Sequence, residues 1–403
     1  MGSYPLAGYN PVLIAQSESA FGTIPAPADV AAFAALALPT IKADLGPVQT
    51  PAVRAMQDRG LGRGMQSAFL SGRYEPVPWS VQMALRTRAD ADDPLRELAL
   101  WKACGFVITT NSSTSVVISQ GNTPIESGDF VSVGLTRILG RSPGEMELER
   151  LAGCFVEQLR IEGGDKEVML TFSGQGQSKG VGTAIASASV ADGSTATVTI
   201  SADESYAFLG GGYYIWESEI ILVAPATAGA TSISITRAQL GTSGVAHSSQ
   251  PIYPYIPSGI SHGGAPIPES LTTTVTFDSS SFRCLSWGID IKTGIASLPG
   301  ETGSALPFQG VKATRYDCTP SFSFVCKGDD VRKLNKERAR KEIAVSFVQG
   351  TTAGGILTAA FPQCEVAGKL KIEDNANDTV TVSGQLRCRE VAAGNSMFTL
   401  TFT

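Results

Sequence analysis

The sequence is poor in charge and in histidine. Charged residues occupy 17% of the 403 positions, and the only histidines are His247 and His262. Both stand in Ser- and Gly-rich stretches without Cys, Asp or Glu at ligand spacing, so we expect loop residues rather than metal ligands. We predict no metal, no cofactor and no catalytic residue for this chain.

A cysteine framework is also missing. The number of cysteines, seven, is odd, and no two of them stand in a CxxC pair. This spacing favours neither a zinc site nor a disulfide scaffold, and it predicts reduced, mostly buried thiols. The cysteines are at positions 104, 154, 284, 318, 326, 364 and 388.

Long apolar runs and a basic surplus are absent as well. The most apolar run, Val30 to Leu38, is too short to span a bilayer, and the first ten residues do not resemble a signal peptide. The net charge is −6 and the pI is about 5.2. Tight nucleic-acid binding by the whole surface is therefore not expected, because it needs clustered Lys and Arg.

Instead the sequence contains a repeated stretch. Residues 158–176 read QLRIEGGDKEVMLTFSGQG, and residues 369–386 read KLKIEDNANDTVTVSGQL. Both stretches alternate apolar and polar residues, share LRIE/LKIE and SGQ, and follow a cysteine by a few positions. Period-two alternation around turn residues predicts a β-hairpin with one buried face. A repeated hairpin suggests a duplicated domain.

The order of predicted elements supports the duplication. A strand, a helix with an acidic cap, further strands, a cysteine and the hairpin occur in both halves. The predicted helices are 93–105, capped by Asp93, and 331–341, which is basic; residues 142–151 are predicted as a turn with a short acidic segment. Between the halves, 179–262 is rich in Ala, Ser, Thr and Gly. We divide the chain into a first domain at 1–178, an inserted β-rich module at 179–262, and a second domain at 263–403.

The N-terminal region has a different character. Residues 1–50 are rich in Pro and Ala with little periodicity, which predicts an extended arm that a neighbouring molecule orders. Residues 51–75 alternate Arg with Gly, which predicts a flexible basic loop.

Several short patterns have both a chemical and a structural interpretation. The GQSKG of residues 176–180 fits the nucleophile elbow G-x-S-x-G, but no helix pattern follows it, so we interpret it as the exit of the hairpin. The oxygens of residues 374–378 lack the Gly and Glu of a calcium loop. The basic helix 331–341 has no interleaved aromatics and is predicted as a solvated outer face.

With these patterns together, the chain resembles the tail tube proteins of phages with long non-contractile tails. Residues 18–23, ESAFGT, are similar to an N-terminal Glu-Ser-x-aromatic-Gly-Thr segment of that family. The order of Gly/Arg loop, strand and capped helix is also similar. Residues 233–255 resemble a module of phage structural proteins. The chain departs from the simplest pattern of that family in its length, which is about twice that of a single-domain tube protein or more, so both the duplication and the insert need an explanation.

The resemblance implies a fold and a role. The fold would be mainly β, with two tail-tube-like β-sandwich or barrel domains, each with a flanking helix. The chain would form homotrimeric, pseudo-sixfold rings that stack into a tube in the virion tail after assembly in the host cytoplasm. Its partners would be itself and the tail terminator, tape-measure and distal tail proteins. DNA would pass through the lumen without specific binding, and no membrane would be involved.

The resemblance and the hairpin pattern together give candidate residues. Inter-ring contacts are assigned to Phe21, Gly22, Arg59, Arg63 and Arg73. The polar faces of the hairpins give the lumen candidates Glu162, Thr171, Glu373, Thr379 and Thr381.

Two other interpretations stay open. The chain could be a distal tail or baseplate ring protein of the same fold. It could also be a virion-associated β-rich hydrolase or carbohydrate-binding module.

Overall fold

The computed structural model describes residues 11–47, 51–57, 66–88, 95–120, 130–140, 146–164, 167–260, 267, 274–277, 280–299, 306–326, 342–351, 353–375, 379–390 and 397–403. Strands account for 61% of the structure and helices for 7%. The prediction of a mainly β fold with sandwich and barrel character is therefore confirmed.

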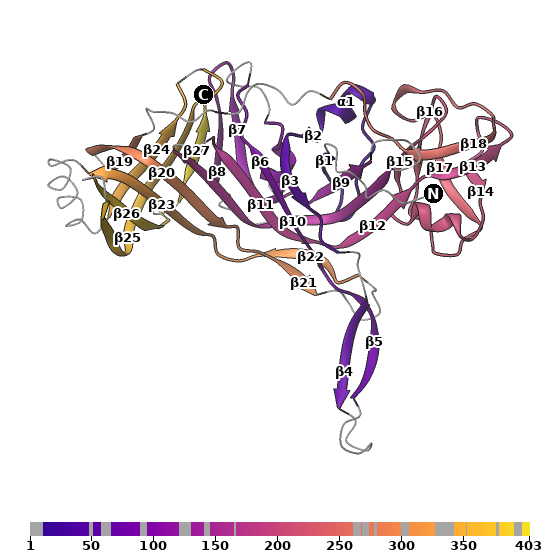
Figure 1. Cartoon of the computed structure of the whole chain (residues 1–403), viewed down its shortest axis with the longest axis horizontal. Coiled ribbons are helices and arrows are strands. Elements are labelled where there is room, and N and C mark those ends of the chain that lie inside the picture. The colour runs from indigo at the N-terminus through magenta and orange to yellow at the C-terminus, as the bar shows by residue number, and fades with distance from the viewer. Residues whose placement is uncertain are drawn as a thin grey trace.

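The central feature is a continuous eight-stranded antiparallel sheet, which we call the long sheet (Figure 1). Its strands, in spatial order, are β3 (Thr40–Asp44), β6 (Val77–Ala84), β11 (Met169–Gly176), β10 (Glu147–Gly164), β20 (Ser280–Lys292), β23 (Asp317–Cys326), β26 (Thr379–Cys388) and β25 (Leu357–Asn375). The two predicted hairpins are β10–β11 and β25–β26, with strand register along most of their length.

Further strands extend from the long strands β10, β20 and β25. On one side lie β7 (Phe106–Asn111), β8 (Ser115–Gln120), β27 (Thr399–Phe402), β24 (Ile343–Gln349) and β19 (Thr274–Phe277). Because β24 pairs with β25 and β19 pairs with both β24 and β20, the strands β20-β23-β26-β25-β24-β19 close into a barrel.

The first half of β10 belongs to another group of strands. Here β2 (Ala37–Leu38), β1 (Val12–Ser17), β9 (Val133–Leu139), β10 and β12 (Ser178–Thr183) pair in that order. In the described residues, two short α-helices accompany the sheets, α1 (Val30–Ala35) and α2 (Leu98–Ala103). Trp101 on α2 is fully buried and contacts Phe172 of the first hairpin edge-to-face at 5.3 Å, so α2 packs against the apolar face of the long sheet.

The pairing pattern occurs twice. In the first half β10 lies between β9 and β11, β11 pairs with β6, and β6 pairs with β3. In the second half β25 lies between β24 and β26, β26 pairs with β23, and β23 pairs with β20. The two halves share one continuous core, with buried residues from Leu13 to Phe402. The division into two domains therefore stays an interpretation.

Each half also inserts a hairpin between two paired strands. In the sequence, the hairpin of β4 (Pro51–Gln57) and β5 (Gln66–Tyr74) lies between β3 and β6. The hairpin of β21 (Ile295–Pro299) and β22 (Phe308–Ala313) lies between β20 and β23 in the same way. Both hairpins lie below the long sheet in Figure 1, and β4–β5 projects far from the rest of the molecule.

Residues 185–254 form a separate six-stranded sheet at the opposite end of the molecule from β25–β26 (Figure 1). Its strand order is β13 (Ile185–Val190), β18 (His247–Pro254), β15 (Gly212–Trp216), β16 (Glu219–Val223), β17 (Ser232–Thr236) and β14 (Thr197–Thr199), with 3-10 turns η3 (Glu204–Phe208) and η4 (Gln239–Gly241). We call this sheet the inserted module. It has its own buried cluster, which includes Phe208, Tyr214 and Trp216.

Four sequence predictions are corrected by these elements. Residues 51–75 are not a flexible loop throughout, because β4 and β5 lie within them and pair as a hairpin. Residues 11–47 are not an extended arm, because β1, α1, β2 and β3 lie within them and Leu13 and Leu38 are buried in the main core. Residues 147–151 are not a turn but the start of β10. The first helix begins at Leu98 rather than near Asp93, which lies outside the described residues, as does the predicted basic helix 331–341.

Candidate functional site: the polar face of the long sheet

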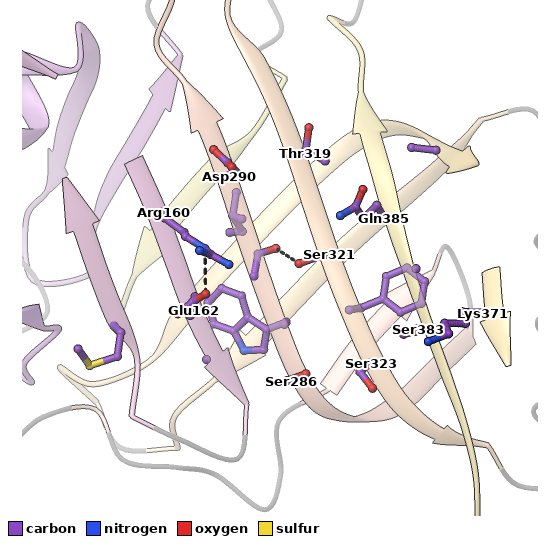
Figure 2. Close-up of a pocket in the computed structure, with 18 of the residues that line it drawn as sticks. Arg160, Glu162, Ser286, Asp290, Thr319, Ser321, Ser323, Lys371, Ser383 and Gln385 are labelled. Atoms are coloured by element: carbon purple, nitrogen blue, oxygen red, sulfur yellow. Dashed lines mark hydrogen bonds and ion pairs between the residues drawn. The ribbon is translucent and has the colours of Figure 1, made fainter. Parts of the chain in front are cut away.

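One face of the long sheet is concave and polar. A groove of about 840 Å³ runs across β10, β20, β23, β26 and β25. Figure 2 shows hydroxyl, amide and charged side chains rising into it from neighbouring strands. Its walls include Arg160, Glu162, Asp290, Ser286, Thr319, Ser321, Ser323, Lys371, Ser383 and Gln385.

Strand register explains why these side chains gather. Arg160 lies opposite Asp290, which lies opposite Thr319. One step further, Ser321 lies opposite Gln385. Alternate residues of a strand point to the same face, so each cross-strand row is polar on one face while the intervening row is apolar. The intervening Leu159, Ile161 and Ile289, for example, are buried.

The groove is close to electrically neutral. Among the residues that line it, three cations, Arg160, Lys292 and Lys371, stand beside four carboxylates, Glu162, Glu167, Asp290 and Asp317.

Several of these charges are already paired. Arg160 Nε lies 2.9 Å from Glu162 Oε1, and Lys371 pairs with Glu373. The amide of Gln158 donates to both carboxylate oxygens of Asp290 at 2.8 Å. The pairs Arg160–Glu162 and Lys371–Glu373 are largely exposed and contribute little stability, but they leave few unpaired positive charges.

Four of the five lumen candidates reach this polar face. Glu162 lines the groove, Thr171 lies opposite Arg160, and Glu373 lies opposite Thr381. Thr379 is the first residue of β26, and its side chain is outside the described part. Sequence reasoning missed Asp290, Lys292, Thr319, Ser321 and Ser383. The alternation in residues 282–292 and 317–326 predicted strands, and its polar positions were the available signal.

The candidates for inter-ring contacts are placed differently. Phe21 packs edge-to-face on Phe308 of β22 at 5.8 Å, so it holds the N-terminal segment against the hairpin β21–β22. Arg73 lies on β5 of the projecting hairpin. Arg59 and Arg63 lie outside the described residues.

Gly22 takes part in a buried network around Glu18. The Glu18 carboxylate accepts hydrogen bonds from the backbone N–H of Gly22 and of Gly153, each at 2.7 Å, and from the Ser132 hydroxyl at 2.6 Å. Burial raises the pKa of Glu18 despite these donors. Gly22 and Gly153 both have positive φ, 79° and 64°, which suits glycine. The segment ESAFGT thus has a structural role as a clamp on β10.

The two edges of the long sheet carry exposed apolar side chains. Within the described residues, β3 pairs only with β6, and the part of β25 beyond Cys364 pairs only with β26. Ile41 on β3 is 61% exposed and Ile372 on β25 is 57% exposed. Ile372 lies opposite the buried Val382, so it continues the apolar face of the sheet beyond its edge.

The prediction that His247 is a loop residue is wrong, because it is the first residue of β18 and its side chain is fully buried. Its ring stacks on Trp216 at 4.3 Å, and its nitrogens lie 2.7 Å from Glu217 and 2.9 Å from Glu219. Glu219 also receives a two-pronged ion pair from Arg237. His262 lies outside the described residues. After Gly176, β12 follows instead of a helix, so the described chain does not build a nucleophile elbow there.

No protein-family model matches the chain, and no curated protein matches it. In the described residues, no cluster of three or more His, Cys, Asp or Glu side chains is arranged to hold a metal ion. None of the helices in that part of the chain has the length and apolar character needed to cross a membrane.

Proposed function

We propose that this chain is a structural virion protein of a long-tailed phage, and that copies of it form stacked rings that make the tail tube. The observation that carries the proposal is the long sheet itself. It is built from two four-stranded units of the same order, and a polar groove crosses β10, β20, β23, β26 and β25. Within the described residues, β3 and the part of β25 beyond Cys364 each pair with one strand only.

The junction between the two units supports ring closure. Inside one chain, the second half of β10 pairs with β20 from Gln158–Lys292 to Gly164–Ser286. By the repeated strand order, β25 corresponds to β10 and β3 corresponds to β20. The free part of β25 would therefore pair with β3 of a second copy in the way that β10 pairs with β20. Open edge strands pair readily with another chain because their N–H and C=O groups lack partners.

The exposed side chains at the edges fit such a contact. At the internal junction, Ile161 lies opposite Ile289 and both are buried. Ile41 and Ile372 would be covered in the same way when two copies meet. A head-to-tail contact that repeats closes into a ring when its rotation divides a full turn. Three chains, with two units each, would give the pseudo-sixfold ring.

The groove composition fits a conduit for DNA. A lumen lined with Lys and Arg would bind phosphates and release counterions, and each added contact would strengthen the binding. The nearly neutral groove, rich in Ser and Thr, would let a duplex slide. The hairpins β4–β5 and β21–β22, which lie on the same side of the long sheet, are suited to contact the next ring.

Electron microscopy of the purified full-length protein tests the proposal. We expect long hollow tubes whose rings contain three chains. Single closed rings that never stack would favour a distal tail or baseplate ring protein. Dispersed monomers at high concentration, or rings with a number of chains other than three, would contradict the proposed assembly.

An edge variant makes the test sharper. Ile372→Lys places a charge in the proposed contact and should abolish tubes while the monomer stays folded. Tyr206→Lys is the matched control, because Tyr206 is 54% exposed but lies on the inserted module. Normal tubes from Ile372→Lys would show that β25 is not the contact edge.

A further inference from the structure

Three of the seven cysteines come together on neighbouring strands. Cys318 is on β23, Cys388 on β26 and Cys364 on β25, and these strands are adjacent in the order β23-β26-β25. Cys364 lies directly opposite Cys388, and their sulfur atoms are 3.3 Å apart. Cys318 and Cys364 are fully buried, whereas Cys388 is 6% exposed.

The pairing geometry favours a bond between two of them. The backbone N–H of Arg389 donates to the carbonyl of Gln363 at 2.9 Å, which marks residues 363 and 389 as a hydrogen-bonded pair. The next pair, Cys364–Cys388, is therefore of the non-hydrogen-bonded kind. Side chains in such pairs are closer together than in hydrogen-bonded pairs, with Cα atoms about 4.5 Å apart, within the range that a disulfide spans.

We propose that Cys364 and Cys388 are a modification site, at which a peroxide oxidant forms a cross-strand disulfide that closes the base of the hairpin β25–β26. The Cys388 thiolate attacks hydrogen peroxide and becomes a sulfenic acid, and one water leaves. The Cys364 sulfur then attacks the Cys388 sulfur, and a second water leaves. The two sulfurs lose two electrons in total, which reduce the peroxide, and the two thiol protons end in water.

The surroundings determine which thiol reacts first and how fast. Cys388 is the only one of the three with measurable exposure, so the peroxide reaches it before the others. The pKa of Cys388 is raised, chiefly by the neighbouring Cys318 thiol, and that of Cys364 is raised by the Cys388 thiol and by burial. Because the thiolate is the nucleophile, the reaction is slow at neutral pH and becomes faster as the pH rises.

The bond would act on the free edge of the long sheet. Residues 365–375 of β25 follow Cys364 directly, and β26 ends at Cys388. A link at these two positions closes a loop that contains the whole hairpin and lowers the entropy of its unfolded state. If β25 pairs with a second copy, which rests on the proposed function, oxidation would strengthen the edge that makes the contact.

Peptide mapping of the full-length protein tests the site. The protein is treated with hydrogen peroxide at pH 8, the peroxide is removed with catalase, and the remaining thiols are alkylated with iodoacetamide in urea, because Cys318 is fully buried in the folded chain. It is then digested without reductant. We expect one linked peptide that joins Cys364 to Cys388 and is lost after dithiothreitol, with Cys318 alkylated. The same treatment in urea should give mixed links, which shows that the oxidant is sufficient.

Variants and a second readout separate the outcomes. Cys318→Ser should keep the link, and Cys364→Ala should lose it. In the linked wild-type protein, hydrogen exchange in β25 and β26 should slow at least tenfold. A native protein without the link, although the urea sample is linked, would overturn the proposal, and so would a link through Cys318. Because the link joins two cysteines of one chain, the mapping result is independent of whether tubes form.

Discussion

Ile161 on β10 lies directly opposite Ile289 on β20, and both side chains are buried, at 0% and 1% exposure. This pair lies in the middle of the β10–β20 pairing that joins the two halves of the chain. Ile372, at the outer edge of the second half, belongs to the hairpin that repeats the first one but is more than half exposed. The neighbouring strand β20 covers Ile161, whereas no described strand covers Ile372.

Truncation of each isoleucine should separate folding from assembly. Ile289→Ala removes buried methyl groups and leaves a cavity, so it should lower the free energy of unfolding by about 2 to 5 kcal/mol. Ile372→Ala should change the free energy of unfolding of the monomer by about 0.5 kcal/mol or less, because the side chain is exposed. Urea denaturation of the dispersed proteins measures both. Equal losses would mean that Ile372 is buried in the monomer.

A charge on the buried, apolar face of either repeated hairpin should prevent folding. Phe172 and Val382 are buried at 0% and 1% exposure. In Phe172→Asp or Val382→Asp an unpaired charge replaces an apolar side chain, which costs several kcal/mol, and the protein should be insoluble. Thr171→Asp is the control, since Thr171 lies on the polar face and should be tolerated. A soluble, folded Val382→Asp protein would show that the register of β26 is wrong.

The inserted module should lose stability in acid through Glu219. Burial raises the pKa of this carboxyl, but the hydrogen bonds from Arg237, Ala238 N–H and His247 outweigh that effect and lower the pKa to about 2. The unfolded state binds the proton nearer pH 4.5, so the contribution of Glu219 is complete above that pH. It disappears between about pH 4.5 and pH 2 and amounts to about 3 kcal/mol.

Hydrogen exchange of β16 from pH 6 to pH 2 measures this loss. In Glu219→Gln the carboxyl is absent, so that part of the pH dependence should vanish and the module should be weaker at pH 6. An unchanged pH profile in the variant would exclude Glu219 as its source.

The hydrogen bonds to Glu18 should be needed to hold the N-terminal segment against β10. Glu18→Ala leaves two backbone N–H groups and the Ser132 hydroxyl without their acceptor and should cost about 3 kcal/mol. Glu18→Gln retains one oxygen acceptor and should cost less. Urea midpoints and the rate of proteolysis within residues 11–28 measure the effect. Equal stability of the alanine variant and the wild type would contradict the role of the clamp.

The charge of the groove should control DNA binding. Wild-type assemblies should show little affinity for duplex DNA at physiological salt. Replacing Glu162 and Asp290 by Lys changes the groove from near neutral to basic, so DNA binding should appear and fall steeply with salt concentration. The control variant is Asp192→Lys, which changes an exposed carboxylate on the inserted module. Equal DNA binding by both variants would show that the groove does not face the DNA.

The sequence alone was enough to predict the elements whose pattern is local. The alternation in residues 158–176 predicted both the strands of the first hairpin and the burial of Leu159, Ile161 and Phe172, because period two assigns alternate residues to opposite faces. The same reasoning placed Glu162 and Thr171 on the polar face. The repeat of this pattern near the C-terminus predicted the second hairpin.

The partners of those faces were decided only by tertiary structure. Nothing local distinguishes Ile161, which β20 covers, from Ile372, which no described strand covers, since both stand in the same four-residue pattern. Residues 11–47 lack periodicity because their short elements alternate between packing against the core and making turns, yet Leu13 is buried by distant strands. His247 stands in a polar stretch of sequence, and only the fold of the module brings Glu217, Glu219 and Trp216 around its ring. Strand pairing and burial between distant segments depend on the whole chain, so a local pattern indicates which face is apolar but not what covers it.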